Sequence, residues 1–172
     1  VGAGYAALAE GQLAGTDVRD LARRIAGTAR TREDAAERVL AFVADRLRYT
    51  GLQFGQSSLV PAAPAEVLRR SYGDCKDLSL LVVALLRSLG HEAHLALLRT
   101  RWDTISQDLP GVGEFDHAIV VLPGRRSLWL DPTAPGIPVG QLPPSDQGRL
   151  ALVTDGRAKA LTRTPESASA GP

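Results

Sequence analysis

One apolar segment near the middle of the chain constrains the fold more than any other. Residues 74–89 read D-C-K-D-L-S-L-L-V-V-A-L-L-R-S-L, with apolar side chains recurring at helical spacing over a wide face. Asp74 followed three residues later by Asp77 fits an N-terminal capping box, and Gly90 supplies a left-handed stop. The apolar stretch 78–86 is far shorter than the roughly 20 residues that span a bilayer. We therefore predict a helix over residues 74–89 that is buried on most sides in a protein core.

The remaining pattern places this helix in an α+β domain. Periodicity predicts helices near the N-terminus and strands after the central helix, and this order is typical of α+β folds. The helices are expected near residues 5–13, at 17–26, at 31–47 with a cap at Thr31, and from Pro64; the strands are expected at 93–99, 117–122 and 127–131. With 172 residues, 44% of them hydrophobic, we predict one domain over residues 1–161 and a disordered tail over 162–172.

Charge and cysteine content exclude several classes of function. The chain has 20 basic and 19 acidic residues spread along its length, so we expect neither a nucleic-acid partner nor an anionic membrane partner. Its single cysteine rules out an internal disulfide and a Cys-rich zinc site. The sequence holds no acidic cluster typical of a calcium loop. We expect no metal and no cofactor.

The single cysteine, Cys75, falls in the first turn of the predicted helix. Unpaired backbone N–H groups and the positive end of the helix dipole stabilise a thiolate at this position. Asp74 and Asp77 oppose that effect, whereas a neighbouring imidazolium would favour it. We expect Lys76 in solvent. Taken alone, a lone cysteine is most often an inert buried thiol, and that alternative stays open at this point.

Of the three histidines, only His117 can reach Cys75. His91 and His94 follow the far end of the helix, about 24 Å from Cys75 at 1.5 Å per residue. Side chains at these two positions would also face opposite ways, so we expect no metal pair there. His117 begins a predicted strand after a loop long enough to return it to the cysteine.

The hairpin that begins at His117 is expected to place a carboxylate beside the imidazole ring. If Gly124 is the centre of an odd-length turn, His117 lies directly across from Asp131 and the two share one face of the sheet. A two-residue turn would move Asp131 to the other face. Trp129 shares the face of Asp131 and is expected to pack beside the site and shield it. Alternatively, Asp131 before Pro132 could only initiate a turn.

Three motifs in fixed order resemble a known family. Y-G-D-C-K-D-L, F-D-H-A-I-V and W-L-D-P-T are similar to the motifs of the transglutaminase-like superfamily, in particular a bacterial branch with G-D-C-K-D, F-x-H and W-x-D-P-T. The similarity extends from Arg48 to Thr133. It implies a papain-like fold whose nucleophile helix packs on an antiparallel sheet. It also implies a catalytic triad at Cys75, His117 and Asp131.

The resemblance implies cysteine-dependent acyl transfer on a peptide or protein substrate. A carboxamide or peptide carbonyl would form a thioester on Cys75, which an amine resolves by transamidation, or water by deamidation or proteolysis. The backbone N–H of Cys75 is expected to contribute to an oxyanion hole. Gln53 is our candidate for the second donor, with Tyr49 and Tyr72 as alternatives. Gln53 could equally be an ordinary loop residue.

A different class of function stays open. The same fold could serve as a non-catalytic peptide-binding module of a larger envelope protein, although a pure binder has no need of the thiol. The chain contains no methionine and no signal-peptide pattern, so we expect a domain excised from a longer protein. The family resemblance favours the periplasm or cell envelope.

Overall fold

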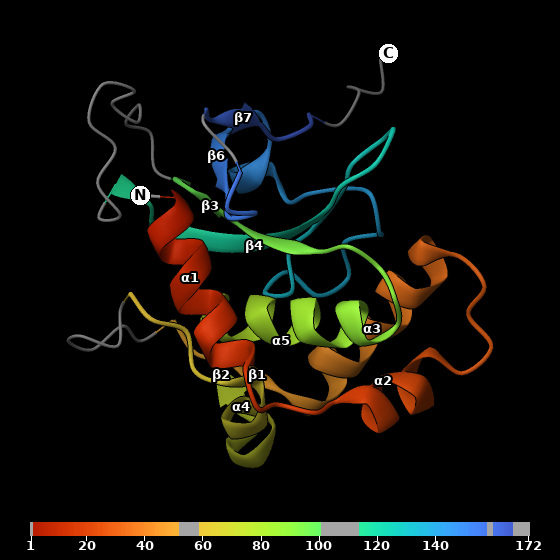
Figure 1. Ribbon diagram of the computed structural model, residues 1–172. Helices are drawn as coiled ribbons and strands as arrows, with labels where there is room; N and C mark the ends of the chain where they lie inside the picture. Colours follow the sequence, from red (N-terminus) through yellow and green to blue (C-terminus); the bar gives the residue numbers. More distant parts are fainter. Residues whose placement is uncertain (1, 52–58, 101–113, 158–159, 167–172) are drawn as a thin grey trace, which may run out of the picture.

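The computed structural model describes residues 2–51, 59–100, 114–157 and 160–166. Helices cover one face of an antiparallel sheet, so the α+β prediction is confirmed (Figure 1). None of the described helices is both long and apolar enough to cross a bilayer. In chain order the elements are α1 Gly2–Leu13, α2 Arg19–Ala26, α3 Arg32–Arg46, β1 Arg48–Tyr49, α4 Pro64–Arg70, β2 Tyr72–Gly73, α5 Cys75–Ser88, β3 His94–Leu98, β4 His117–Leu122, β5 Leu128–Leu130, a 3-10 helix Pro144–Asp146, β6 Leu150–Val153 and β7 Thr162–Arg163.

The predicted central helix is α5, and it forms the middle layer of the molecule. Asp74 caps it by accepting hydrogen bonds from the N–H groups of Lys76 and Asp77, and Asp77 reciprocates to the N–H of Asp74. All residues of α5 from Cys75 to Leu86 are buried. In Figure 1 the helix lies between the sheet above it and the helices α2, α3 and α4 below it. Burial on both sides explains why its apolar face is so wide.

The sheet has five antiparallel strands in the order β5-β4-β3-β6-β7. Side chains alternate between its two faces, and each face belongs to a separate hydrophobic cluster. The cluster that includes α5 takes Leu95, Leu97, Ala118, Val120, Leu122, Leu128 and Leu130 from the sheet. The other cluster takes Ala96, Leu98, Ile119, Val121, Trp129 and Ala151, together with Leu142. The helix packs on β3 and β4, whose side chains reach it through every second residue.

The hairpin between β4 and β5 has a different register from the one we expected. Val120 pairs with Leu130 and Leu122 with Leu128, so the turn spans residues 123–127 and its centre is Arg125 rather than Gly124. If this register continues, the residue across from Asp131 is two positions beyond His117. The prediction of directly opposed residues is wrong, although the turn is odd-length and keeps both side chains on one face.

A side chain from outside the hairpin contacts its turn. Arg32 at the start of α3 donates hydrogen bonds to the carbonyls of Pro123 and Arg126, at 3.1 and 2.5 Å. A Cβ added to Gly124 would lie 2.6 Å from the guanidinium of Arg32. The absence of a side chain at Gly124 leaves room for this approach of Arg32, and Gly124 does not mark the centre of the turn.

The ordered chain continues beyond the predicted boundary at residue 161. Thr162 and Arg163 form β7 against β6, and Thr164 is buried. The hydroxyl of Thr164 accepts a hydrogen bond from Arg149 N and donates one to Asp146 O. The start that we predicted for the disordered tail, residue 162, is therefore too early. Thr162 and Arg163 pair with β6, and the Thr164 hydroxyl has backbone hydrogen-bond partners. Residues 167–172 lie outside the described part.

Candidate active site

The G-D-C-K-D motif forms a tightly connected helix start with Cys75 as its first helical residue. Gly73 is required by space, since a Cβ there would lie 2.7 Å from Cβ of Asp77. Besides its capping bond, Asp77 accepts hydrogen bonds from Ala62 N at 2.7 Å and from Arg70 at 2.5 Å. The motif thus fixes the chain on both sides of the cysteine. Its cap takes the N–H groups one and two residues after Cys75 and not that of Cys75 itself.

Lys76 is buried beside the cysteine, which corrects our expectation. Only 5% of Lys76 and 8% of Asp74 are exposed, and the two side chains form an ion pair. Burying an isolated ammonium group would cost several kcal/mol, so the pair with Asp74 is what permits its position. The pair also compensates the charge of one of the two aspartates that flank Cys75.

His117 and Asp131 form the predicted pair despite the shifted register. His117 Nε2 lies 3.1 Å from Asp131 Oδ2. The other oxygen of Asp131 accepts hydrogen bonds from the backbone N and the hydroxyl of Thr133, at 2.8 and 2.7 Å. Asp131 therefore initiates a local turn, as the alternative interpretation held, and also partners the imidazole. The threonine of W-L-D-P-T fixes the orientation of the carboxylate.

Cys75 belongs to the same cluster, because an interaction with its side chain contributes to raising the pKa of His117. Burial alone would lower the pKa of His117, but the bonds to Asp131 and Cys75 and the charges of Asp131 and Asp146 raise it to about 10. Burial alone would raise the pKa of Asp131, whereas His117 and Thr133 hold it below its ordinary value. At neutral pH the ring is an imidazolium beside a carboxylate.

Asp146 is a member of this cluster that the sequence analysis missed. It is fully buried in the 3-10 helix, and its Oδ2 lies 3.7 Å from His117 Nε2. Burial raises its pKa to about 6; the charge of His117 lowers it and that of Asp131 raises it. The segment L-P-P-S-D-Q-G resembles a surface loop, so only the length of chain that returns to the sheet could have suggested it.

These three side chains are also the residues to examine for a metal site. Within the described ranges, His117, Asp131 and Asp146 form a group whose potential ligand atoms all lie within 4.8 Å of one another. A metal ion there would have to replace the proton that His117 and Asp131 share. We therefore interpret the group as a hydrogen-bonded cluster.

Ser79 fixes the distance between the helix and the histidine strand. It is fully buried one turn after Cys75, and its hydroxyl donates a 2.9 Å hydrogen bond to the carbonyl of Ala118, next to His117. Ser79 is the polar interruption of the apolar stretch 78–86, and that interruption was the available signal. A buried hydroxyl on a core face needs a partner.

Two tyrosines have their pKa values raised by burial and by Cys75. Tyr49 ends β1 and pairs with Gly73, and it is 46% exposed. Burial of its hydroxyl and the negative charges of Cys75, Asp131 and Asp74 raise its pKa, so the hydroxyl is near the site. Tyr5 in α1, which the sequence analysis missed, is buried and has its pKa raised by burial and by Cys75.

Tyr72 and Trp129 have contacts outside this cluster. The Tyr72 ring lies under Arg70, with 4.8 Å between the guanidinium carbon and the ring centroid, and is 46% exposed. Trp129 is buried in the hydrophobic cluster on the sheet face away from α5. Its shielding role stays a prediction. Gln53 lies outside the described residues, and its oxyanion role also stays a prediction.

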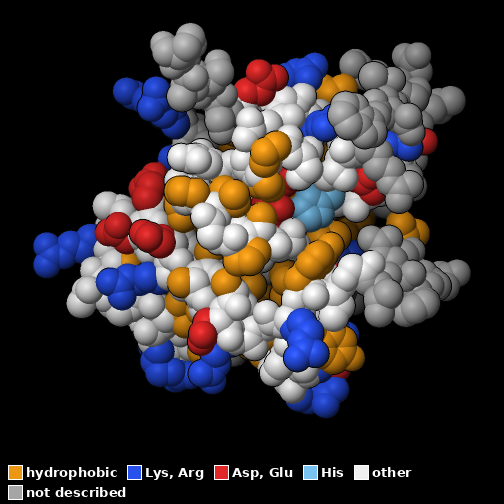
Figure 2. Space-filling view, turned by 180° about the vertical axis from the view of Figure 1, so that it is seen from behind, with side chains coloured by type: hydrophobic (Ala, Val, Ile, Leu, Met, Phe, Trp, Pro, Cys, Tyr) orange, Lys and Arg blue, Asp and Glu red, His pale blue; other side chains and the backbone are white. Residues whose placement is uncertain are grey.

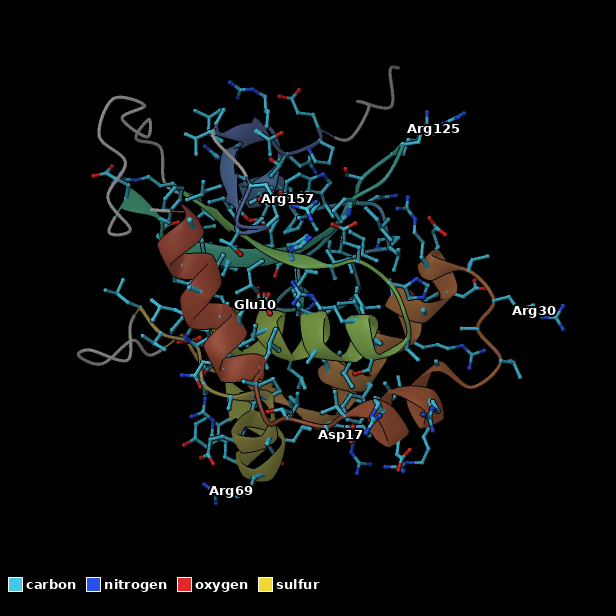
Figure 3. The ribbon with its side chains drawn as sticks, in the orientation of Figure 1. Glu10, Asp17, Arg30, Arg69, Arg125 and Arg157 are labelled. Atoms are coloured by element: carbon cyan, nitrogen blue, oxygen red, sulfur yellow. The ribbon has the colours of Figure 1, made fainter. Side chains whose placement is uncertain are left out.

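The surface carries its charges in scattered positions. Figure 2 shows hydrophobic side chains across the middle of one face, with basic and acidic side chains mainly around its rim. In Figure 3, Arg30, Arg69 and Arg125 point outward at separate edges of the molecule. The expectation of a peptide or protein substrate stays a prediction.

The chain is similar to known proteins both in sequence and in fold. A model of the transglutaminase-like superfamily matches residues 19–121. No curated protein matches the chain. A putative protease from Parabacteroides distasonis superposes with a TM-score of 0.58 at 11% identity, over 80% of this chain and 31% of the other. A putative cysteine protease from Cytophaga hutchinsonii superposes with a TM-score of 0.57 at 16% identity, over 87% and 46%. The chain spans less than half the length of each, and this likeness shows a shared fold.

Proposed function

Because this chain belongs to the transglutaminase-like superfamily, we propose that it is a cysteine enzyme that cleaves or exchanges an amide bond of a peptide or protein through a thioester on Cys75. One observation carries the proposal: the His117 ring lies within hydrogen-bond distance of Asp131 and interacts with the Cys75 side chain, which helps to raise the pKa of the histidine. Cys75 and His117 lie within the matched residues, whereas Asp131 lies beyond them. The role of Asp131 therefore rests on its 3.1 Å contact with the ring.

The first half-reaction forms the acyl-enzyme. The Cys75 sulfur transfers its proton to His117 and attacks the carbonyl carbon, and the carbonyl π electrons move to oxygen. When the tetrahedral intermediate collapses, the C–N bond breaks and His117 gives its proton to the leaving amine. The acyl group remains on sulfur as a thioester. Asp131 holds the ring in the tautomer that this transfer requires.

The second half-reaction releases the acyl group. Neutral His117 takes a proton from the incoming water or amine, whose oxygen or nitrogen forms a bond to the carbonyl carbon. The C–S bond then breaks, and the thiolate and imidazolium are restored. Water gives hydrolysis or deamidation, and an amine gives transamidation. Both outcomes use the same residues of this chain.

Stabilisation of the oxyanion is assigned to the start of α5. The Cys75 N–H lies at the positive end of the helix dipole, and the cap leaves it to a ligand. Gln53 and Tyr49 are the candidates for the second donor. The position of Tyr49 beside Gly73 supports it, since that pairing brings its strand to the residue before the helix cap.

Mass spectrometry with a peptide mixture tests this proposal. The protein is incubated with a mixture of short glutamine-containing peptides and a biotinylated primary amine, then quenched in acid. We expect a peptide adduct on Cys75 together with one product class: biotinylated peptide, glutamate-containing peptide or cleaved peptide.

Three variants make the result specific. Cys75→Ser and His117→Ala should give neither adduct nor product, whereas His94→Ala, at the far end of α5, should behave as wild type. If the wild type and Cys75→Ser retain the same peptides by equilibrium binding and neither yields product, the chain is a non-catalytic peptide-binding module and the enzymatic proposal is wrong.

A further inference from the structure

A buried acidic residue outside the predicted triad faces the same histidine. We propose that Asp146 is a positioning residue, whose carboxyl lies behind the His117–Asp131 pair and controls the charge and orientation of the imidazole. The inference deepens the proposed function. Only its consequence for proton transfer by His117 during the reaction rests on that function. Its structural content, a coupling between Asp146 and the charge of His117, can be measured in the protein without any substrate.

The geometry of Asp146 differs from that of an ordinary buried aspartate. Its Oδ1 accepts a 2.9 Å hydrogen bond from Ser145, whereas its buried Oδ2 has no hydrogen-bond partner and lies 3.7 Å from His117 Nε2. Buried polar atoms nearly always have partners, so an unpaired carboxylate oxygen requires an explanation. The charge of the imidazolium supplies one, because a desolvated carboxylate is stabilised by a nearby cation.

The backbone around Asp146 holds the carboxyl in this position. Its N–H donates to Pro143 O at 2.9 Å, and its carbonyl accepts from the Thr164 hydroxyl at 2.5 Å. Thr164 follows β7, and its N–H donates in turn to Arg149 O at 2.8 Å. These hydrogen bonds connect the 3-10 helix to the outer strands β6 and β7 and hold it beside His117.

The charged groups around Asp146 come from several elements. His117 approaches from the start of β4, and Asp131 from the end of β5. Arg149, just before β6, directs its Nε to Ser145 O at 2.9 Å. Cys75 also interacts with the His117 ring. Asp131 and Asp146 thus share one imidazolium, and such a carboxyl pair retains a proton more readily than either acid alone.

The proton on this pair alters what His117 can do. With Asp146 protonated, its O–H is available to Asp131 and one negative charge faces Nε2. With Asp146 ionised, two negative charges face the ring, which stabilises the imidazolium and makes it a weaker acid towards the leaving amine. Burial places this change near pH 6. Asp146 thereby acts on the reaction through His117 without touching the substrate.

Titration of the histidine rings by NMR tests the inference directly. In Asp146→Asn the amide keeps an acceptor for Ser145 and removes the charge, so the pKa of His117 should fall by about one unit relative to wild type. His94, which pairs with Glu92, is an internal reference and should not move. Asp20→Asn, on exposed α2, removes an equal charge far from the site and should leave both rings unchanged.

The wild type provides a second measurement if the variant does not fold. Its His117 resonance should show an additional inflection near pH 6, where Asp146 titrates. The inference is wrong if Asp146→Asn folds and leaves the pKa of His117 unchanged, or if the wild-type resonance lacks the inflection. If Asp146→Asn changes the pKa of His117 but the wild type shows no acyl transfer, the role of Asp146 is supported and the proposed function is refuted. If the wild type shows acyl transfer but Asp146→Asn leaves the pKa of His117 unchanged, the proposed function is supported and the role of Asp146 is refuted.

Discussion

Ser79 Oγ donates a 2.9 Å hydrogen bond to the backbone carbonyl of Ala118, the residue that follows His117. This bond connects the helix that carries the sulfur to the strand that carries the imidazole, close to both. Apolar packing between α5 and the sheet holds the layers together but is non-directional. A directed bond at this position fixes the displacement of one layer along the other, and so the distance between Cys75 and His117.

Ser79→Ala should therefore weaken both stability and the site. Loss of this buried hydrogen bond is expected to lower the free energy of unfolding by about 1 kcal/mol. The alkylation rate of Cys75 should also fall, because the ring is less firmly held. Urea denaturation and iodoacetamide labelling measure the two effects. Ser88→Ala, at the other end of the same helix, is the matched control, and an equal effect of both substitutions would refute the positioning role.

Gly73→Ala should disrupt the helix start that carries Cys75. The new Cβ would lie 2.7 Å from Cβ of Asp77, a backbone-near atom that cannot move aside without breaking the capping box. We expect a loss of about 1–3 kcal/mol in unfolding free energy, typical of overpacking. Gly4→Ala in α1, where a Cβ meets nothing within 4 Å, should be neutral or stabilising. Thermal unfolding of the two variants decides the matter; equal melting temperatures would contradict this account of Gly73.

Stability should decline in the alkaline range because of His117. Its pKa is raised from 6.5 to about 10, so its contribution to stability is complete below pH 6.5 and is lost as the pH rises through 10. Asp131 acts in the opposite range, because its lowered pKa gives stability above pH 4 that is lost on acidification. Urea denaturation of wild type and His117→Ala between pH 6.5 and 10 should show a decline that the variant largely lacks. Parallel curves would contradict the raised pKa.

The second oxyanion donor can be identified by comparing two substitutions. Loss of one such donor typically lowers kcat by about 10²–10³-fold while the nucleophile stays intact. Gln53→Ala, or Tyr49→Phe if the phenol is the donor, should cause this loss and leave the iodoacetamide rate of Cys75 unchanged. Gln56→Ala is the control within the same segment. If neither substitution reduces kcat more than the control, both assignments are wrong.

Features set by neighbouring residues were predictable from the sequence. The capped helix α5 was expected from Asp74, Asp77 and Gly90, and β4 has the predicted bounds His117–Leu122. Membership of the transglutaminase-like superfamily is confirmed by the match over residues 19–121. The first motif was informative because Gly73, Asp74 and Asp77 each have a local contact that depends on their residue type.

Features set by distant contacts were not predictable. The turn of the hairpin is contacted by Arg32, which lies 91 residues from Pro123 along the chain. Lys76 is buried, whereas a lysine side chain ordinarily keeps its charge in solvent. Asp146 followed two prolines in an apparent loop, and its place against the histidine depends on Thr164 and the outer strands. The strand β6, L-A-L-V between turn glycines, carried a local signal that could have been used.

The central claim is that the imidazole of His117 activates the sulfur of Cys75, and the rate of iodoacetamide labelling across pH tests it most directly. Cys75 is the single cysteine, so the label reports on one site. We predict rapid labelling of wild type and of His94→Ala well below pH 8, and a large loss of that reactivity in His117→Ala. Equal labelling rates of wild type and His117→Ala throughout this range would contradict the claim.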